Sequence, residues 1–156
     1  VSIGPQIHAG LAQAGVEQGT PAYDQFMMAA QTAIDSADPI NFAAFTAGKN
    51  LLVQEVVGND TSPSDQVIPN SVPGAPLSGT EPLISALGLT AIDSSTQSAD
   101  GVRAATRFTS GVHGSLLSPA ADAAVTAEMQ GQMASLIISG GHAVQVANPT
   151  VLKPVE

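Results

Sequence analysis

The sequence predicts an α/β fold in which helices flank a parallel sheet, and three observations lead to this prediction. Helical and extended patterns alternate along the chain, as they do in α/β proteins. The clearest strand, residues 51–57 (LLVQEVV), is almost continuously apolar, which is typical of a buried parallel strand. The length of 156 residues, of which 44% are apolar and 11% charged, suffices for a packed core. We therefore expect residues 1–156 to form a single domain.

Two helices are expected before this strand. Thr20 is a typical N-cap, and Pro21 suits the first helical position because its missing N–H has no partner there. Apolar residues then recur at three- and four-residue steps: Tyr23, Phe26, Met27, Ala30, Ala33, Ile34 and Ala37. This stripe predicts a core helix, with a lid or a lipid-binding groove as the alternative. Asp38-Pro39 predicts a short second helix through residue 45, and residues 1–19 predict a loop with one helical turn.

The second half of the chain predicts two strands around a long helix. Residues 102–109 alternate, with both arginines on one face and smaller or apolar side chains on the other, and HAVQV (142–146) is a short final strand. Ser118-Pro119 predicts the start of the helix between them, which the glycines at 140 and 141 end. Its expected apolar stripe consists of Val125, Met129, Met133, Leu136 and Ile137. Residues 70–100, rich in Pro, Gly, Ser and Thr, predict a long surface excursion with one helical turn.

Composition excludes several classes of function. The formal net charge of −9 repels nucleic-acid phosphates and anionic membranes, so we expect no nucleic-acid partner. No apolar run reaches the roughly 18 residues of a membrane span. The chain has no Cys, which excludes disulfides and thiolate metal sites. It begins with Val, and we expect it to be a processed or excised piece of a longer protein.

Two residues are candidates for catalysis because each lies in a turn just beyond a predicted strand. These are Asp65 and His113, and catalytic groups gather at the carboxyl ends of strands in open α/β sheets. A carboxylate that orients an imidazole, which then takes a proton from a nucleophile, is the triad arrangement. Asp60 in the same loop is the rival acid, and ordinary turn or structural roles are the alternative for all three. His8 and His142 have no metal-ligand spacing, so neither a metal nor another cofactor is expected.

A nucleophile is missing from this pattern. No serine lies in the Gly-x-Ser-x-Gly frame of a nucleophile elbow. Ser115 follows His113 by two residues and cannot easily turn back onto that imidazole. The sequence therefore supplies an acid and a base without the group that they would activate.

Four segments taken together resemble one protein family. LLVQEVVGNDTSPSDQVIPN, GTEPLISALGL, GVHGSLLSP and AAVTAEMQGQMASLI are similar, in this order, to the C-terminal part of bacterial extracellular lipases with an α/β-hydrolase fold, a family that includes surface lysophospholipases. The resemblance covers nearly the whole chain. It implies that Asp65 matches the triad acid, that His113 matches the base, and that the AAVTAEMQGQMASLI helix packs on the sheet as the last helix.

The resemblance also implies what the chain would need. The nucleophile and oxyanion-hole residues of the family would lie on an upstream segment, so we expect the chain alone to be incomplete as a carboxylic-ester hydrolase. Its partners would be a lipid or ester substrate and that upstream segment, or a second copy of the chain, because a sheet of two or three strands exposes apolar faces and edges. The expected location is secreted or on the bacterial cell surface.

Two other functions remain open from the sequence. The low charge, the high Ala and Gly content and the missing nucleophile also fit a secreted acidic binding module without chemistry. The third alternative is a serine-independent hydrolase that uses Asp60, Asp65 and Glu55 as paired carboxylates, although Glu55 lies inside a predicted strand.

Overall fold

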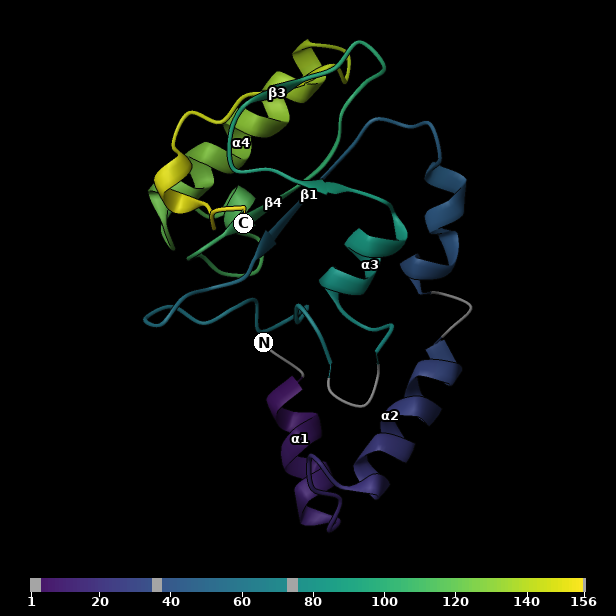
Figure 1. The fold of residues 1–156 in the computed structure, drawn as a ribbon. Coiled ribbons are helices and arrows are strands. Elements are labelled where there is room, and N and C mark those ends of the chain that lie inside the picture. Colours follow the sequence, from purple (N-terminus) through teal and green to yellow (C-terminus); the bar gives the residue numbers. More distant parts are fainter. Residues whose placement is uncertain (1–3, 35–37, 73–75, 156) are drawn as a thin grey trace.

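A computed structural model describes residues 4–34, 38–72 and 76–155 and shows a mixed α/β chain with a small parallel sheet (Figure 1). In chain order the elements are α1 (Gly4–Gln13), α2 (Pro21–Ile34), the 3-10 helix η2 (Pro39–Thr46), β1 (Leu51–Val56), α3 (Thr80–Ala86), β2 (Thr90–Ala91), β3 (Thr96–Gln97), β4 (Arg103–Phe108), the 3-10 helix η3 (Ser115–Leu117), α4 (Ala123–Ile138), β5 (Ala143–Val144) and the 3-10 helix η4 (Pro149–Val151). The predicted α/β class is confirmed at this level.

The main sheet has three parallel strands in the order β1-β4-β2. The two predicted strands pair along their whole length, from Leu51 opposite Arg103 to Val56 opposite Phe108. The predicted alternation holds in β4, and Ala105 on the face of the two arginines is also fully buried. The reason is that β4 is the central strand and is covered on both faces.

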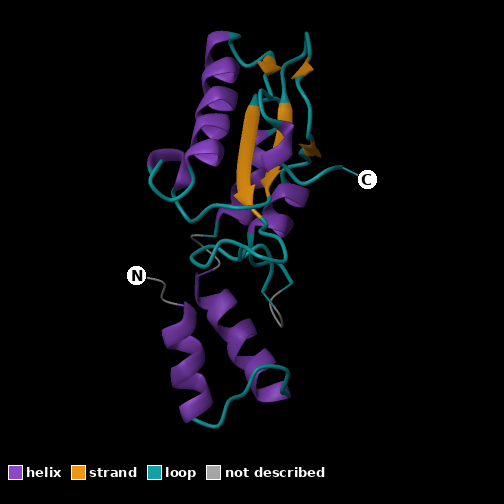
Figure 2. Ribbon diagram, turned by 90° about the vertical axis from the view of Figure 1, so that its left-hand side faces the viewer, coloured by secondary structure: helices purple, strands orange, loops and turns teal. Residues whose placement is uncertain are grey.

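The two faces of the sheet carry different layers. On one face, α4 packs over a core cluster formed by Val56, Phe108, Val125, Met129 and Leu152. α3 and η2 lie on the opposite side of β1 and β4 (Figures 1 and 2). Because side chains alternate along a strand, neighbouring residues of β1 and β4 face different layers.

The long excursion predicted at 70–100 contains more structure than one helical turn. α3 is seven residues long, β2 joins the main sheet beside β4, and β3 pairs antiparallel with β5. The predicted HAVQV strand thus exists as β5 but belongs to this separate two-stranded sheet. These short strands form through tertiary contacts with β4 and β5, which the local turn-rich composition does not reveal.

The long helix α4 begins later than predicted. Its N-cap is Asp122, whose side chain accepts hydrogen bonds from the backbone N–H groups of Ala124 and Val125, whereas Ser118 ends η3. The predicted end at the two glycines is confirmed. The predicted apolar stripe is wrong at Met133 and Ile137, which are exposed, whereas Leu136 packs against the core cluster of Val102, Ala104 and Val144. Polar side chains occupy the buried face instead.

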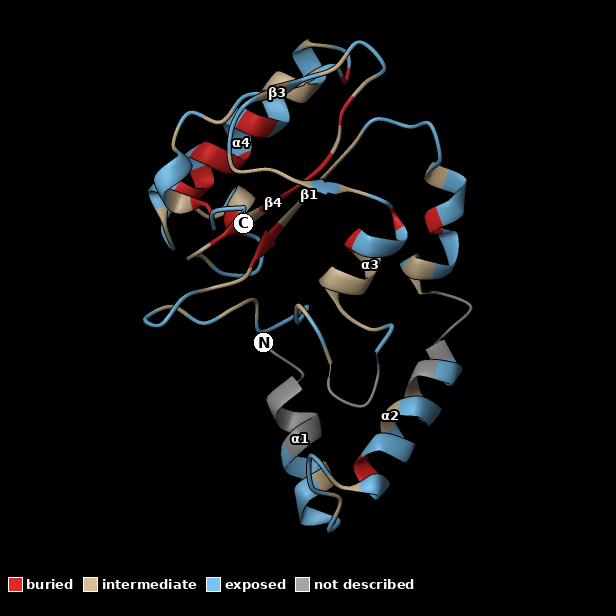
Figure 3. Ribbon diagram, viewed as in Figure 1, coloured by how far each residue is buried: buried red, intermediate tan, exposed pale blue. Residues whose placement is uncertain are grey.

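The first two long helices stand apart from the sheet (Figures 2 and 3). α2 starts where predicted, with Thr20 accepting a hydrogen bond from the Tyr23 N–H, but the ten-residue helix α1 was predicted only as a turn. Tyr23 is 1% exposed, whereas Phe26 and Met28 are 41% and 63% exposed. The expectation of a core helix is therefore wrong for most of α2, and Ala37 of the predicted stripe lies outside the described residues. Within the described ranges, no helix is long and apolar enough to cross a membrane.

Candidate active site

Asp65 and His113 lie in two loops that leave adjacent strands at the same edge of the sheet. β1 ends at Val56 and β4 at Phe108, which are partners in the parallel register. The carboxyl ends of neighbouring parallel strands meet at one edge, which is where ligands bind in open α/β sheets. The structure therefore brings together two side chains that are 48 residues apart in sequence.

The acid loop, residues 57–70, folds back tightly after β1. Gly58 has φ +72°, and a Cβ there would lie 2.5 Å from the Ser62 carbonyl oxygen, so the turn requires glycine. The Asn59 side chain accepts hydrogen bonds from the backbone N–H groups of Thr61 and Ser62. The Asp65 N–H then donates to the Val56 carbonyl at 3.0 Å. The loop thus returns Asp65 to the end of the strand that it left.

The His loop, residues 109–118, is closed by a second tight turn. The Ser115 hydroxyl accepts a hydrogen bond from the Val112 N–H at 2.7 Å, and the Ser115 N–H donates to the Val112 carbonyl at 3.0 Å. Gly111, with φ +122°, lies so close to Ser115 that an added Cβ would be 2.9 Å from its Oγ. His113 is therefore presented at the apex of a turn whose base is fixed.

The two side chains form a hydrogen bond of 2.9 Å between His113 Nδ1 and Asp65 Oδ2. Asp65 Oδ1 accepts from the backbone N–H groups of Val67 and Ile68 at 2.7 and 3.0 Å. Partial burial by itself would raise the pKa of Asp65, but the hydrogen bonds from His113 and from the two backbone groups outweigh it and lower the pKa. Asp65 therefore remains a carboxylate.

This geometry suits a base that a carboxylate orients. An imidazole that donates Nδ1–H to a carboxylate presents Nε2 as the acceptor for another proton. The His113 side chain is 45% exposed, compared with 14% for Asp65, so the acid is sheltered and the base is accessible. The pair can take a proton from a hydroxyl group that is placed against His113.

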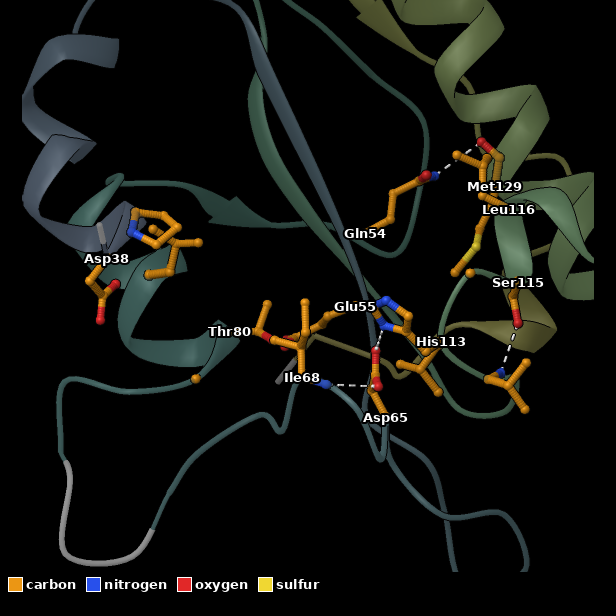
Figure 4. Close-up of a pocket in the computed structure, with 16 residues that line it drawn as sticks. Asp38, Gln54, Glu55, Asp65, Ile68, Thr80, His113, Ser115, Leu116 and Met129 are labelled. Atoms are coloured by element: carbon orange, nitrogen blue, oxygen red, sulfur yellow. Dashed lines mark hydrogen bonds and ion pairs between the residues drawn. The ribbon is translucent and has the colours of Figure 1, made fainter. Parts of the chain in front are cut away.

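A pocket of about 460 Å³ lies beside this pair (Figure 4). His113 and Asp65 form one wall, and α3 with the residues around it forms the wall across from them. The apolar lining comes from Pro39, Val56, Ile68, Leu83, Val112, Leu116 and Met129. A mainly apolar pocket with a few convergent polar groups is typical of a small-molecule or acyl-chain site.

A nucleophile is absent from the described lining of the pocket. Its side-chain hydroxyl groups are those of Thr80 and Ser115. Ser115 is 1% exposed and its Oγ holds the Val112 N–H, so it is a structural part of the His loop. Thr80 is the first residue of α3, on the wall opposite His113. The structure thus contains the acid–base pair and the pocket, but the pocket presents no activated serine.

The remaining sequence candidates lie elsewhere. Asp60 is exposed in the turn at 59–62 and is not part of the pocket lining, so the structure brings Asp65 rather than Asp60 to His113. His142 Nδ1 contacts the Ser98 carbonyl at 3.0 Å, next to the antiparallel pair β3–β5. The side chain of His8 lies outside the described residues. Among the residues described, no three or more His, Asp or Glu side chains form a group that could hold a metal ion.

Glu55 is the polar residue of the pocket whose setting the sequence did not reveal. It is 4% exposed, and its Oε1 accepts from Arg107 Nε at 3.0 Å. Its Oε2 is buried and finds no hydrogen-bond partner among the described residues. Burial, above all, raises its pKa to about 7, against the opposing effect of Arg107. Only the register of β1 against β4 shows that these two residues meet, and a strand pattern in the sequence does not contain that register.

Comparison of the chain with protein-family profiles, with characterised proteins and with solved structures gave no match. Function is therefore inferred from the geometry of the site and from the sequence resemblance described above.

Proposed function

We propose that this chain supplies the acid and the base of a serine carboxylic-ester hydrolase of the α/β-hydrolase class, acting on lipids or related esters at the bacterial surface or outside the cell. The observation that carries the proposal is the 2.9 Å contact between Asp65 and His113 at the carboxyl ends of two adjacent parallel strands. The order acid, then His, along the chain is that of α/β-hydrolases. The apolar pocket beside the pair suits an acyl chain.

The nucleophile then has to come from another segment, and β1 is where that segment would attach. β1 lies at the edge of the main sheet and pairs with β4 alone among the described strands. Leu51 and Val57 donate their N–H groups toward β4, so by alternation the backbone of Leu52 and Gln54 faces the other side. A further strand that carries the serine at its end would place that serine at the same sheet edge as His113.

The first test is labelling with a fluorophosphonate, which reacts only with an activated serine. The isolated chain should not be labelled. The chain mixed or fused with its upstream segment should be labelled and should hydrolyse short-chain nitrophenyl esters. Labelling that never appears in any complete form would contradict the proposal and favour the alternative, an acidic binding module without chemistry.

The second test concerns the residues of the pair in the complete enzyme. His113→Ala should lower turnover on the order of 10⁶-fold and Asp65→Ala about 10⁴-fold, because the serine loses its base or the base loses its orientation. Asp60→Ala is the matched control and should leave turnover within about twofold of wild type, since its side chain is exposed outside the pocket. Near-normal hydrolysis by His113→Ala would rule out the assignment.

A further inference from the structure

Two carboxyl groups share one guanidinium on the face of the sheet that α3 covers. Arg107 donates from Nε to Glu55 Oε1 at 3.0 Å and from its terminal nitrogen to Glu81 Oε2 at 2.7 Å. Glu55 and Arg107 are paired in the register of β1 and β4, and Glu81 belongs to the first turn of α3. We call these three residues the carboxyl cluster. It joins three elements that line or support the pocket.

The carboxyl cluster lacks one hydrogen-bond donor. Glu55 Oε2 is buried without a hydrogen-bond partner in the part of the chain that the structure describes, and its neighbour Glu81 is a second acid. With both acids ionised, the cluster would carry one uncompensated negative charge and a buried oxygen without a donor, and both cost stability. A proton on Glu55 removes both problems, because the cluster becomes neutral and the buried oxygen becomes a donor toward Glu81.

We propose that Glu55 is a positioning residue for the Asp65–His113 pair: as a neutral acid it donates its proton to Glu81, and the carboxyl cluster thereby holds the start of α3 against the acid loop. Only the catalytic consequence of this inference, the positioning of the Asp65–His113 pair for ester hydrolysis, rests on the proposed function. The proton sharing and the contact with the acid loop are properties of the isolated chain.

Backbone hydrogen bonds connect the carboxyl cluster to the acid loop that holds Asp65. The backbone N–H of Glu81 donates to the Asn70 carbonyl at 2.9 Å, and that of Thr80 donates to the Pro69 carbonyl at 3.1 Å. A Cβ on Gly79 would lie 2.7 Å from the Asn70 carbonyl oxygen, so the two segments are in close contact.

Residues 69 and 70 directly follow the two backbone N–H groups that bind Asp65 Oδ1, those of Val67 and Ile68. A shift of the α3 start would therefore displace the donors that orient the acid. In this way a change of charge at Glu55 reaches the catalytic pair through α3 and the acid loop.

The charged groups around Glu55 favour its neutral form. Among the described residues, Arg107 from β4 is the cation that contacts it, and Glu81 from α3 competes for that cation. The other titratable groups of the pocket are Asp38 before η2, Asp65 in the acid loop and His113 in the His loop. Burial and the charge of Glu81 raise the pKa of Glu55 to about 7, so the proton is lost as the pH rises through neutrality.

The direct test is carbon-13 NMR of the Glu55 carboxyl in the isolated chain. Wild type should show this carboxyl protonated at pH 6 and ionised at pH 8.5. Glu81→Gln should shift the midpoint of its titration to lower pH, because the competing negative charge is removed. Glu17→Gln makes the same chemical change on an exposed loop and should not move it. A Glu55 carboxyl that is already ionised at pH 6 would overturn the proposal.

The second measurement tests the connection to Asp65 by hydrogen exchange. The Val67 and Ile68 amides should lose about tenfold in protection, after correction for intrinsic rates, between pH 6 and pH 8.5 in wild type. Glu55→Gln keeps an N–H donor without a titrating charge, so its protection should be as high at pH 8.5 as at pH 6. Glu55→Leu removes the donor, and protection should be low at both values. Equal loss of protection in wild type and Glu55→Gln would overturn the positioning role, whatever hydrolysis assays show.

Discussion

The two faces of the sheet hold buried polar side chains in different ways. Facing α4, Gln54, Thr106, Glu128 and Gln132 form what we call the amide network. Facing α3, the next residues along the same strands, Glu55 and Arg107, belong to the carboxyl cluster. A shift of one residue along each strand thus separates an arrangement rich in donors from one that lacks a donor.

The buried polar side chains of the amide network have hydrogen-bond partners. Gln132 Oε1 accepts from Gln54 Nε2 and Thr106 Oγ1, each at 2.9 Å, and Gln132 Nε2 donates to Glu128 Oε1 at 2.9 Å. The Glu128 carboxylate also accepts from the backbone N–H groups of Ala147 and Asn148. Complete hydrogen bonding makes a buried network rigid, whereas a missing donor makes it sensitive to protons. We therefore expect the amide network facing α4 to stabilise the fold, and the carboxyl cluster facing α3 to respond to pH.

Of the changes that test this difference between the two faces, Gln132→Leu in the amide network should have the largest effect on stability. The substitution removes the acceptor of the buried Thr106 hydroxyl and one hydrogen bond each from the Gln54 amide and the Glu128 carboxylate, so the free energy of unfolding should fall by about 4 kcal/mol. Denaturant unfolding followed by circular dichroism measures this loss. Gln130→Leu on the same helix removes one exposed hydrogen bond and should cost less than about 1 kcal/mol. If both variants unfold at the wild-type midpoint, the amide network does not carry the stability assigned to it.

A smaller change in the free energy of unfolding is expected when pH changes the charge of the carboxyl cluster facing α3. Burial raises the pKa of Glu55 from 4.5 to about 7, so between these values the folded chain binds a proton that the unfolded chain has lost. Its contribution is fully present below pH 4.5 and is lost as the pH rises through 7, by about 3 kcal/mol in total. Unfolding titrations from pH 4.5 to 8 should show this decline in wild type. Glu55→Gln should lack it, and an identical decline in that variant would assign the pH dependence to other groups.

The pH dependence of Asp65 has the opposite sign. The hydrogen bonds from His113 and the acid loop outweigh the effect of burial and lower the pKa of Asp65 below 3.8, so its contribution to stability is present above that pH. It is lost as the pH falls through the lowered pKa. Asp65→Asn should remove this acid-side loss when unfolding is measured below pH 4.

The smallest effect concerns the start of α4, which positions the amide network. Asp122→Ala should lower the free energy of unfolding by about 1 kcal/mol, because two backbone N–H groups of α4 and the Ser110 hydroxyl lose their acceptor. Ser118→Ala should change it by less than about 0.5 kcal/mol, since Ser118 does not cap the helix. Thermal unfolding of both variants distinguishes the two positions. A larger loss for Ser118→Ala would restore the start predicted from the sequence.

The sequence predicted those parts of the fold that local patterns determine. The two long strands, the start of α2 and the end of α4 follow from apolar runs, from Thr20-Pro21 and from paired glycines. Asp65 and His113 were found as candidates because each follows a strand. That reasoning needs only the positions of strand ends and not the contacts between them.

The remaining features depend on contacts that are distant in sequence. β2 is two residues long and exists because Thr90 and Ala91 pair with β4. The Ser118-Pro119 pattern was misleading because the backbone there is used by η3, and Asp122 caps the helix instead. The sequence showed Glu55 only as a polar residue within a strand. Its partner Arg107 lies 52 residues further along the chain, and Glu81, which shares that arginine, lies 26 residues before Arg107. Partners at such separations become visible only once the strand register is known.

The backbone hydrogen bond from Asp65 to the Val56 carbonyl limits what can join the open edge of β1. This bond occupies the last outward acceptor of the strand, so an added strand can pair only along residues 51–54, a length of about 13 Å. An incoming strand that extended further would have to displace Asp65 and break its contact with His113. If a further strand joins β1 as proposed, its register and the placement of Asp65 beside His113 therefore depend on the same carbonyl.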